Sequence, residues 1–214
     1  MGLYQHIAEF GTLSIGRTMH RNAPLKRAVL LDRDGTINRD RGYVHRVEDL
    51  ELLDHCAEGL ARMSELGFEL VITTNQSGIA RGYFTEAEMH EFNAALCDRL
   101  NAAGVTIAAI YYCPFHPTEG IGPYKRESRL RKPDCGMLTT AAAQRGLDLA
   151  ASFAIGDKFS DIEAGRAASC RTILLRGHDA NALSMSVRPD YVAADLLEAA
   201  GIIERISLPA MEAA

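Results

Sequence analysis

The sequence predicts an α/β protein in which a doubly wound, Rossmann-like parallel sheet is covered by helices on both faces. Short apolar, partly β-branched segments alternate with helical segments along most of the chain. Such alternation with short connections is typical of a parallel sheet. Polar residues gather directly after the apolar segments, at the edge where proteins of this class bind their ligands.

Each predicted strand is a short run of apolar and β-branched residues bounded by polar or glycine-containing segments. The five strands are expected at residues 28–31, 68–73, 107–112, 152–155 and 172–175. We expect the first strand at the centre of the sheet, with the order fifth, fourth, first, second, third.

The helices are predicted from side-chain periodicity and from their end signals. Leu60, Met63 and Leu66 share one face of a helix that Gly67 ends. Thr85 to Glu88 has the spacing of a capping box and opens a long helix that Gly104 ends. Two further helices are expected at residues 136–145 and 162–168. The connections after the first and second strands are too short for a large cap domain, so a minimal cap and two substrate loops, residues 38–49 and 113–133, are expected.

The composition limits the classes of protein to which this chain can belong. The 214 residues are 47% hydrophobic, enough for one core, and the net charge of −5 with mixed signs argues against a nucleic-acid-binding surface. The sequence contains no apolar stretch of about 18 residues and no secretory signal, so we expect a cytoplasmic protein without membrane contact. The five scattered cysteines are expected to be free thiols.

We expect a monomer, because no exposed apolar stripe is evident. One domain is predicted over residues 26–207, between an N-terminal extension at 1–25 and a C-terminal tail at 208–214.

Acidic, hydroxyl and basic side chains follow four of the predicted strands. Asp32 and Asp34 follow the first, Thr74 the second, Lys132 the third and Asp157 the fourth. Two acids one residue apart suit phosphoryl chemistry, in which one attacks phosphorus and the other transfers protons. Each of the two acids would repel a phosphate charge by about 4 kcal/mol at about 4 Å. A cation must offset that repulsion, and oxygen ligands favour Mg²⁺.

The ordered set Asp-x-Asp-Gly-Thr, Thr-Asn, Arg-Lys-Pro and Gly-Asp-x-x-x-Asp resembles the haloacid dehalogenase superfamily of phosphotransferases. Longer strings narrow the resemblance to the D-glycero-D-manno-heptose 1,7-bisphosphate 7-phosphatase branch, which has histidinol-phosphate phosphatase relatives. These strings are Asp32–Asn38, Gly42–His45, Thr74–Gly82 and Arg131–Pro133. The resemblance covers roughly residues 27–197. It implies a phosphatase that acts on a small sugar phosphate, in the synthesis of the heptose nucleotide for bacterial surface polysaccharide.

The resemblance also implies roles for individual residues. Asp32 is the expected nucleophile, which forms an aspartyl phosphate, and Asp34 the expected acid and base. Thr74 and Lys132 are expected to stabilise the phosphoryl group. The expected magnesium ligands are Asp32, the backbone carbonyl of Asp34, and Asp157, while Asp161 is expected to orient its neighbours. The expected substrate-binding residues are Asp40, Arg41, Gly42, Tyr43, Asn75, Gln76, Ser77, Arg131 and Lys158.

One loop departs from the family pattern. In the family, a Cys-x-His and a Cys-x-Cys after the third strand hold a structural zinc. Cys113 occupies the first ligand position, but the other three hold Phe115, Ser128 and Leu130. His116 and Cys135 lie nearby at a spacing that does not rebuild a four-ligand site. We therefore expect no zinc in this loop.

Three alternatives stay open from the sequence. The substrate could be histidinol phosphate or another sugar phosphate, since the changed loop helps to shape the pocket in the family. A non-catalytic binding or scaffold protein could use the same fold, although every expected catalytic side chain is present. A phosphomutase would need a cap that excludes water from the aspartyl phosphate.

Overall fold

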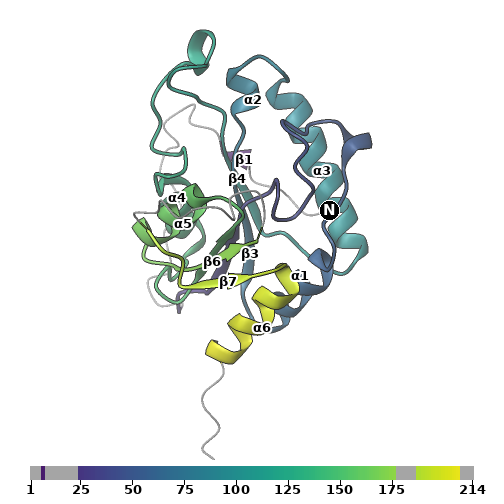
Figure 1. The fold of residues 1–214 in the computed structure, drawn as a ribbon, viewed down its shortest axis with the longest axis vertical. Coiled ribbons are helices and arrows are strands. Elements are labelled where there is room, and N and C mark those ends of the chain that lie inside the picture. Colours follow the sequence, from purple (N-terminus) through teal and green to yellow (C-terminus); the bar gives the residue numbers. More distant parts are fainter. Residues whose placement is uncertain (1–5, 8–23, 177–186, 208–214) are drawn as a thin grey trace, which may run out of the picture.

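A seven-stranded parallel sheet forms the centre of the described part of the computed structural model (Figure 1). The model describes residues 6–7, 24–176 and 187–207. The strands are β1 (His6–Ile7), β2 (Ala28–Leu31), β3 (Glu69–Asn75), β4 (Ala109–Cys113), β5 (Phe153–Gly156), β6 (Arg171–Leu175) and β7 (Tyr191–Ala193). Their order across the sheet is β1-β4-β3-β2-β5-β6-β7, and every pair is parallel.

The predicted doubly wound sheet is confirmed. The five predicted strands correspond to β2 to β6 and occur in the predicted order, and the sheet differs in gaining one strand at each edge. At one edge, β1 pairs with β4 and belongs to the predicted extension at residues 1–25. Most of that extension, and the whole predicted tail at 208–214, lie outside the described residues.

Helices cover both faces of the sheet (Figure 1). They are α1 (Cys56–Glu65), α2 (Ser77–Ala80), α3 (Glu86–Ala102), α4 (Gly136–Arg145), α5 (Phe159–Ala167) and α6 (Leu196–Ser207). The four predicted helices are found as α1, α3, α4 and α5, whereas α2 and α6 were not predicted. The two predicted substrate loops contain only short 3₁₀ turns, η1 (Val47–Asp49) and η2 (Gly122–Tyr124).

The alternation of side chains along β2 divides the core into two layers. Val29 and Leu31 pack with residues of α1, α3 and α6 on one face. Ala28 and Leu30 pack with residues of α4 and α5 on the other. All four side chains are buried, which is why β2 is a continuous apolar run rather than an alternating one. The central strand is therefore held rigidly at the edge where Asp32 begins the next loop.

The long helix α3 begins as its sequence predicts. The Thr85 side chain accepts a hydrogen bond from the Glu88 amide, and the Glu88 carboxylate accepts one from the Thr85 amide. This capping box satisfies two amides at the helix N-terminus. No helix among the described residues is both long enough and apolar enough to cross a membrane.

Candidate active site

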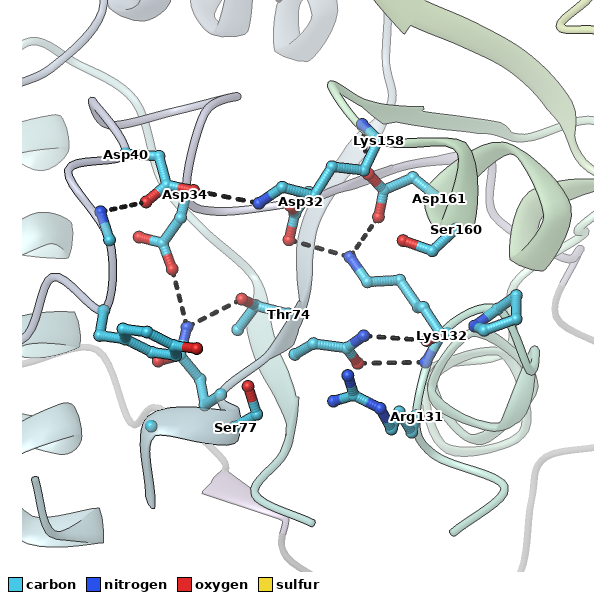
Figure 2. A pocket seen from close by; sticks show the side chains of 16 residues that line it. Asp32, Asp34, Asp40, Thr74, Ser77, Arg131, Lys132, Lys158, Ser160 and Asp161 are labelled. Atoms are coloured by element: carbon cyan, nitrogen blue, oxygen red, sulfur yellow. Dashed lines mark hydrogen bonds and ion pairs between the residues drawn. The ribbon is translucent and has the colours of Figure 1, made fainter. Parts of the chain in front are cut away.

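A buried lysine ties together two of the strand-end acids. The Lys132 ammonium lies 2.9 Å from Asp32 Oδ1 and 2.5 Å from Asp161 Oδ1, and it donates to the Thr73 carbonyl at 2.7 Å (Figure 2). Burial disfavours its charge, but the carboxylates of Asp161 and Asp32 outweigh that effect and raise the pKa of Lys132. The lysine thus stays a cation beside Asp32.

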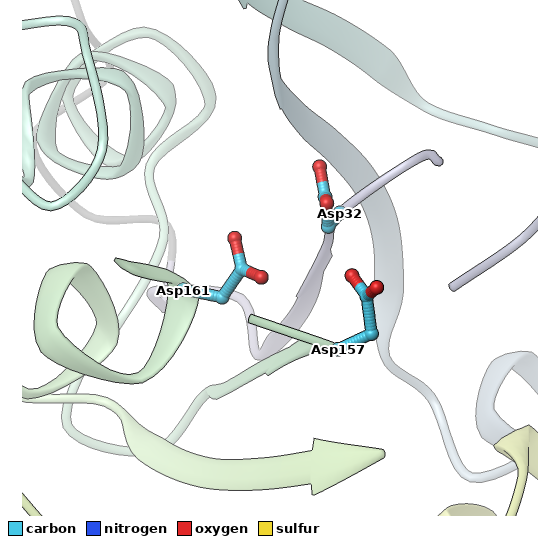
Figure 3. A group of neighbouring side chains, drawn as sticks. All are labelled: Asp32, Asp157 and Asp161. Carbon is cyan, nitrogen blue, oxygen red and sulfur yellow. The ribbon is translucent and has the colours of Figure 1, made fainter. Parts of the chain in front are cut away.

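Three acids form a cluster that suits a metal ion. Ligand atoms of Asp32, Asp157 and Asp161 lie within 4.8 Å of one another, and all three residues are buried (Figure 3). Neither carboxylate oxygen of Asp157 has a hydrogen-bond partner in the described part of the chain. Buried carboxylates without partners are costly, and hard oxygen donors are the ligands that Mg²⁺ prefers. The donor set therefore fits magnesium.

The surroundings of the cluster raise the pKa of two of its acids. Burial raises the pKa of Asp157 to about 7; Lys158 opposes this shift, while Asp32 and Asp161 add to it. Burial likewise raises the pKa of Asp161 to about 6 against the opposing effect of Lys132. A cation in the cluster would relieve both the burial cost and the mutual repulsion of these carboxylates.

The Asp34 carboxylate accepts four hydrogen bonds. Arg33 donates two, from Nε to Oδ1 at 3.0 Å and from Nη2 to Oδ2 at 2.9 Å. Asn38 donates to Oδ1 and Gln76 to Oδ2, each at 2.9 Å. Neither Arg33 nor Asn38 was predicted from the sequence as a site residue. The available signal was an arginine placed between the two acids at the end of a buried strand, where a charged side chain needs a partner.

The carboxyl end of β3 supports the site in a way that was only partly predicted. Thr74 is buried, and its hydroxyl accepts a hydrogen bond from Gln76 at 3.0 Å. The Asn75 side chain instead pairs with the backbone of Lys132: its Nδ2 donates to the carbonyl at 3.0 Å, and its Oδ1 accepts from the amide at 3.1 Å. Asn75 therefore holds Lys132 in place, in addition to lining the cavity.

A cavity of about 610 Å³ opens over these side chains. All of the predicted site residues line it except Arg41 and Asp157. Asp157 belongs to the acid cluster with Asp32 and lines a second cavity instead. Arg41 does not line the cavity, and its guanidinium pairs with Glu51 at 2.5 Å. The structure therefore does not bring Arg41 to the site.

The walls of the cavity carry cations and aromatic rings. Lys158 pairs with Asp40 at 3.0 Å, and burial opposes but does not prevent a rise in the pKa of Lys158 caused by Asp32, Asp157 and Asp40. Tyr43 has a positive φ of 56° and packs edge-on against Tyr83 at 4.8 Å between ring centroids. Asp40 and Tyr43 come from one loop and Lys158 from another, and the three side chains line the cavity together.

Apolar and cation–π contacts hold the loop in which the family carries zinc. Phe115 is buried, and the Arg126 guanidinium lies 3.8 Å from its ring centroid. Cys113 is also buried, and Cys135 packs against the neighbouring apolar cluster. Among the described residues, only the cluster of Asp32, Asp157 and Asp161 has the grouping of a metal site.

Comparisons with known proteins show what this chain is similar to. A family model described as HAD-hydrolase-like matches residues 129–199. The D-glycero-alpha-D-manno-heptose-1,7-bisphosphate 7-phosphatase of Burkholderia mallei is 45% identical over 149 residues, which are 70% of this chain and 79% of that protein. The corresponding beta-named enzyme of Escherichia coli K12 is 42% identical over 69% of this chain and 78% of its own.

A solved structure shows the same fold. The D,D-heptose 1,7-bisphosphate phosphatase of B. bronchiseptica, in complex with magnesium and phosphate, superposes with a TM-score of 0.75 and 28% identity. The match covers 84% of this chain and 99% of that one.

Proposed function

Because this chain belongs to the haloacid dehalogenase-like family of heptose-1,7-bisphosphate 7-phosphatases, we propose that it removes the 7-phosphate of D-glycero-D-manno-heptose 1,7-bisphosphate. The observation that carries the proposal is the meeting of Asp32, Asp157, Asp161 and Lys132 at one edge of the sheet. These side chains come from three separate segments, with Asp161 in the first turn of α5, and together they supply a nucleophile, a metal site and a fixed cation.

We assign the magnesium site to Asp32 and Asp157 together with the backbone carbonyl of Asp34. The free oxygens of Asp157 support this assignment, as does the magnesium in the related solved structure. When bound, the ion supplies the positive charge that lets a phosphate approach the carboxylates. Asp161, which pairs with Lys132, is placed to steady both the lysine and the ligand cluster.

The chemistry runs in two steps on Asp32. In the first, an Asp32 oxygen forms a bond to phosphorus, the bond from phosphorus to the sugar oxygen breaks, and Asp34 gives that oxygen a proton. In the second, Asp34 takes a proton from water as the water attacks phosphorus. The bond from phosphorus to Asp32 then breaks, which releases inorganic phosphate.

Two neighbours are placed to stabilise the transferring group. Lys132 lies beside Asp32 as a buried cation and neutralises part of the phosphoryl charge. The Thr74 hydroxyl accepts its hydrogen bond from Gln76, so its own hydrogen is free to be donated to a phosphoryl oxygen. Both groups are fixed before substrate binds, which is the arrangement that lowers a barrier most effectively.

The cavity volume of about 610 Å³ suits a sugar bisphosphate. Arg131, Lys158, Tyr43 and Ser77 line its wall. We assign the sugar and its second phosphate to these side chains, since arginine forks and lysine cations bind phosphate. Arg41, which pairs with Glu51, is left out of this set.

The first test removes the nucleophile. Asp32→Asn keeps the side-chain shape but loses the attacking oxyanion, so we expect turnover of the bisphosphate to be abolished with the fold retained. Asp98→Asn, at an exposed acid on α3, serves as the matched control and should keep wild-type kinetics. Phosphate release by Asp32→Asn at the wild-type rate would disprove the nucleophile assignment.

The second test addresses the substrate. We expect kcat/KM to be highest for the heptose bisphosphate in a panel that includes fructose 1,6-bisphosphate and histidinol phosphate. A preference for histidinol phosphate, or equal values across the panel, would overturn the substrate assignment and leave the phosphatase chemistry intact.

A further inference from the structure

Arg33 is a charged side chain with no exposed surface, and the proposed mechanism gives it no chemical role. Burying a guanidinium costs several kcal/mol unless charge and hydrogen bonds compensate. An arginine buried between the two acids of the site therefore needs compensating partners. Its hydrogen-bond partners indicate what it does.

We propose that Arg33 is a positioning residue that holds the Asp34 carboxylate in place for proton transfer to the sugar oxygen. This inference rests on the proposed function of Asp34. The guanidinium meets the carboxylate through two parallel hydrogen bonds, from Nε to Oδ1 at 3.0 Å and from Nη2 to Oδ2 at 2.9 Å. This paired geometry fixes the plane of the carboxylate as well as its distance.

The rest of the guanidinium is anchored to parts of the chain that are distant in sequence. Nη1 donates to Asn93 Oδ1 on α3 at 2.9 Å, and Nη2 also donates to the Val44 carbonyl at 3.0 Å. The ring of Phe92, also on α3, lies 4.6 Å below the guanidinium. Asn93 is itself held by a contact from Nδ2 to Met89 Sδ at 3.0 Å. Arg33 therefore has little freedom to rotate, and it passes this rigidity to Asp34.

The contact with Val44 links proton transfer to the substrate loop. Val44 directly follows Gly42 and Tyr43, which line the cavity. One buried cation thus connects the acid and base, the loop that contacts substrate, and the long helix behind them. A displacement of about 1 Å at such a position can cost about 10²-fold in rate, so loss of this anchor should act on the chemical step.

The test uses the leaving group to separate positioning from a general structural effect. A sugar alkoxide needs a proton as it departs, whereas the nitrophenolate of 4-nitrophenyl phosphate does not. For Arg33→Lys and Arg33→Met we expect kcat/KM for the sugar bisphosphate to fall by about 10²-fold, the scale of general acid catalysis. We compare kcat/KM because it covers only the steps up to departure of the leaving group, whereas hydrolysis of the aspartyl phosphate, in which Asp34 acts as the base, is common to both substrates. The fall with 4-nitrophenyl phosphate should be several-fold at most. An equal fall with both substrates, or no fall with either, would overturn the proposal.

Two further variants keep the test decisive if the Arg33 variants fold poorly. Asn93→Leu removes the anchor on α3 and should show the same split between substrates at smaller size; an even loss would count against the proposal. Arg27→Met is the matched control, because Arg27 also lies over a phenyl ring, that of Phe68, and donates to a backbone carbonyl. Neither contact involves a site residue, so Arg27→Met should not lower the value for the sugar bisphosphate more than the value for 4-nitrophenyl phosphate.

Asp34→Asn separates this inference from the proposed function. If it shows the split and the Arg33 and Asn93 variants do not, the positioning role fails and the proposed mechanism stands. If Asp34→Asn lowers kcat/KM equally for both substrates, the acid role of Asp34 fails and the positioning role fails with it.

Discussion

Asp157 can lie deep in the site because a glycine faces it. A Cβ added at Gly35 would meet Asp157 Oδ2 at 2.2 Å, far inside van der Waals contact. In the same way, a Cβ at Gly156 would meet Asp161 Oδ2 at 2.2 Å. The glycines next to the two acidic motifs therefore provide the space in which the carboxylates converge.

We predict that Gly35→Ala weakens Mg²⁺ binding by displacing Asp157. Gly104→Ala is the matched control, since the two glycines have similar positive φ values of 85° and 79° but a Cβ at Gly104 would meet nothing within 4 Å. Both variants should lose about 1–2 kcal/mol of stability to left-handed backbone strain. Only Gly35→Ala should raise the Mg²⁺ concentration needed for half-maximal activity. Equal magnesium dependence in the two variants would contradict the role given to Gly35.

The residues that follow the strands could be predicted as site residues because parallel strands end at one edge. The side chains that form hydrogen bonds with these site residues could not be predicted in this way. Arg33 and Asn93 are 60 positions apart, and no local pattern pairs them. The direction of the Arg41 side chain could not be predicted from the sequence either, because a loop has no periodicity that tells which side chain faces inward. Asn75 lies at the carboxyl end of β3, yet its pairing with Lys132 depends on a loop 57 positions away.

Helices and strands could likewise be predicted where their signals are local in the sequence, and could not where they depend on distant residues. The predicted strands and long helices have end signals in their own residues, such as the Thr85 capping box. Helix α2 has only four residues, too few to show a helical period. Helix α6 does have a local start signal, since the Asp195 carboxylate accepts a hydrogen bond from the Glu198 amide. Its position against α1 depends on a distant contact: a Cβ on Gly59 of α1 would meet the Leu196 carbonyl at 2.4 Å. The close approach of α1 and α6 therefore depends on one glycine far away in the sequence.

The loop after β4 should be independent of zinc. Its Phe115 side chain is fully buried and takes the place of a ligand, so we predict that a zinc chelator leaves the melting temperature unchanged. Phe115→Ala, in contrast, should cost about 3–5 kcal/mol, as expected for loss of a buried phenyl ring. Metal analysis of the purified protein provides the direct check. One zinc per chain, or a chelator-induced fall in melting temperature, would show that the loop binds zinc through other residues.

The stability of the whole domain should depend on pH through the buried acid cluster. Burial raises the pKa of Asp157 from 3.8 in the unfolded chain to about 7 in the fold. The folded state then binds more protons than the unfolded state between these values, so the free energy of unfolding falls as pH rises through this window. For the metal-free protein we predict a loss of about 3 kcal/mol between about pH 5 and pH 8, at 1.36 kcal/mol per unit.

Magnesium should reverse this loss, because it binds the ionised carboxylates. Urea unfolding in EDTA and in excess Mg²⁺ should therefore show a larger stabilisation by the ion at about pH 8 than at about pH 5. Asp161, whose pKa burial raises to about 6, adds to the loss in the lower part of this window. Acids with a lowered pKa, such as Glu69, on which Lys26 and Arg145 outweigh the effect of burial, change stability below it. Asp157→Asn isolates the effect, because it removes the titrating group and one ligand together. The variant should lose most of the pH dependence of its stability and most of its stabilisation by Mg²⁺. Equal stabilisation of the wild-type protein by magnesium at both pH values would refute the assignment of Asp157 as a ligand.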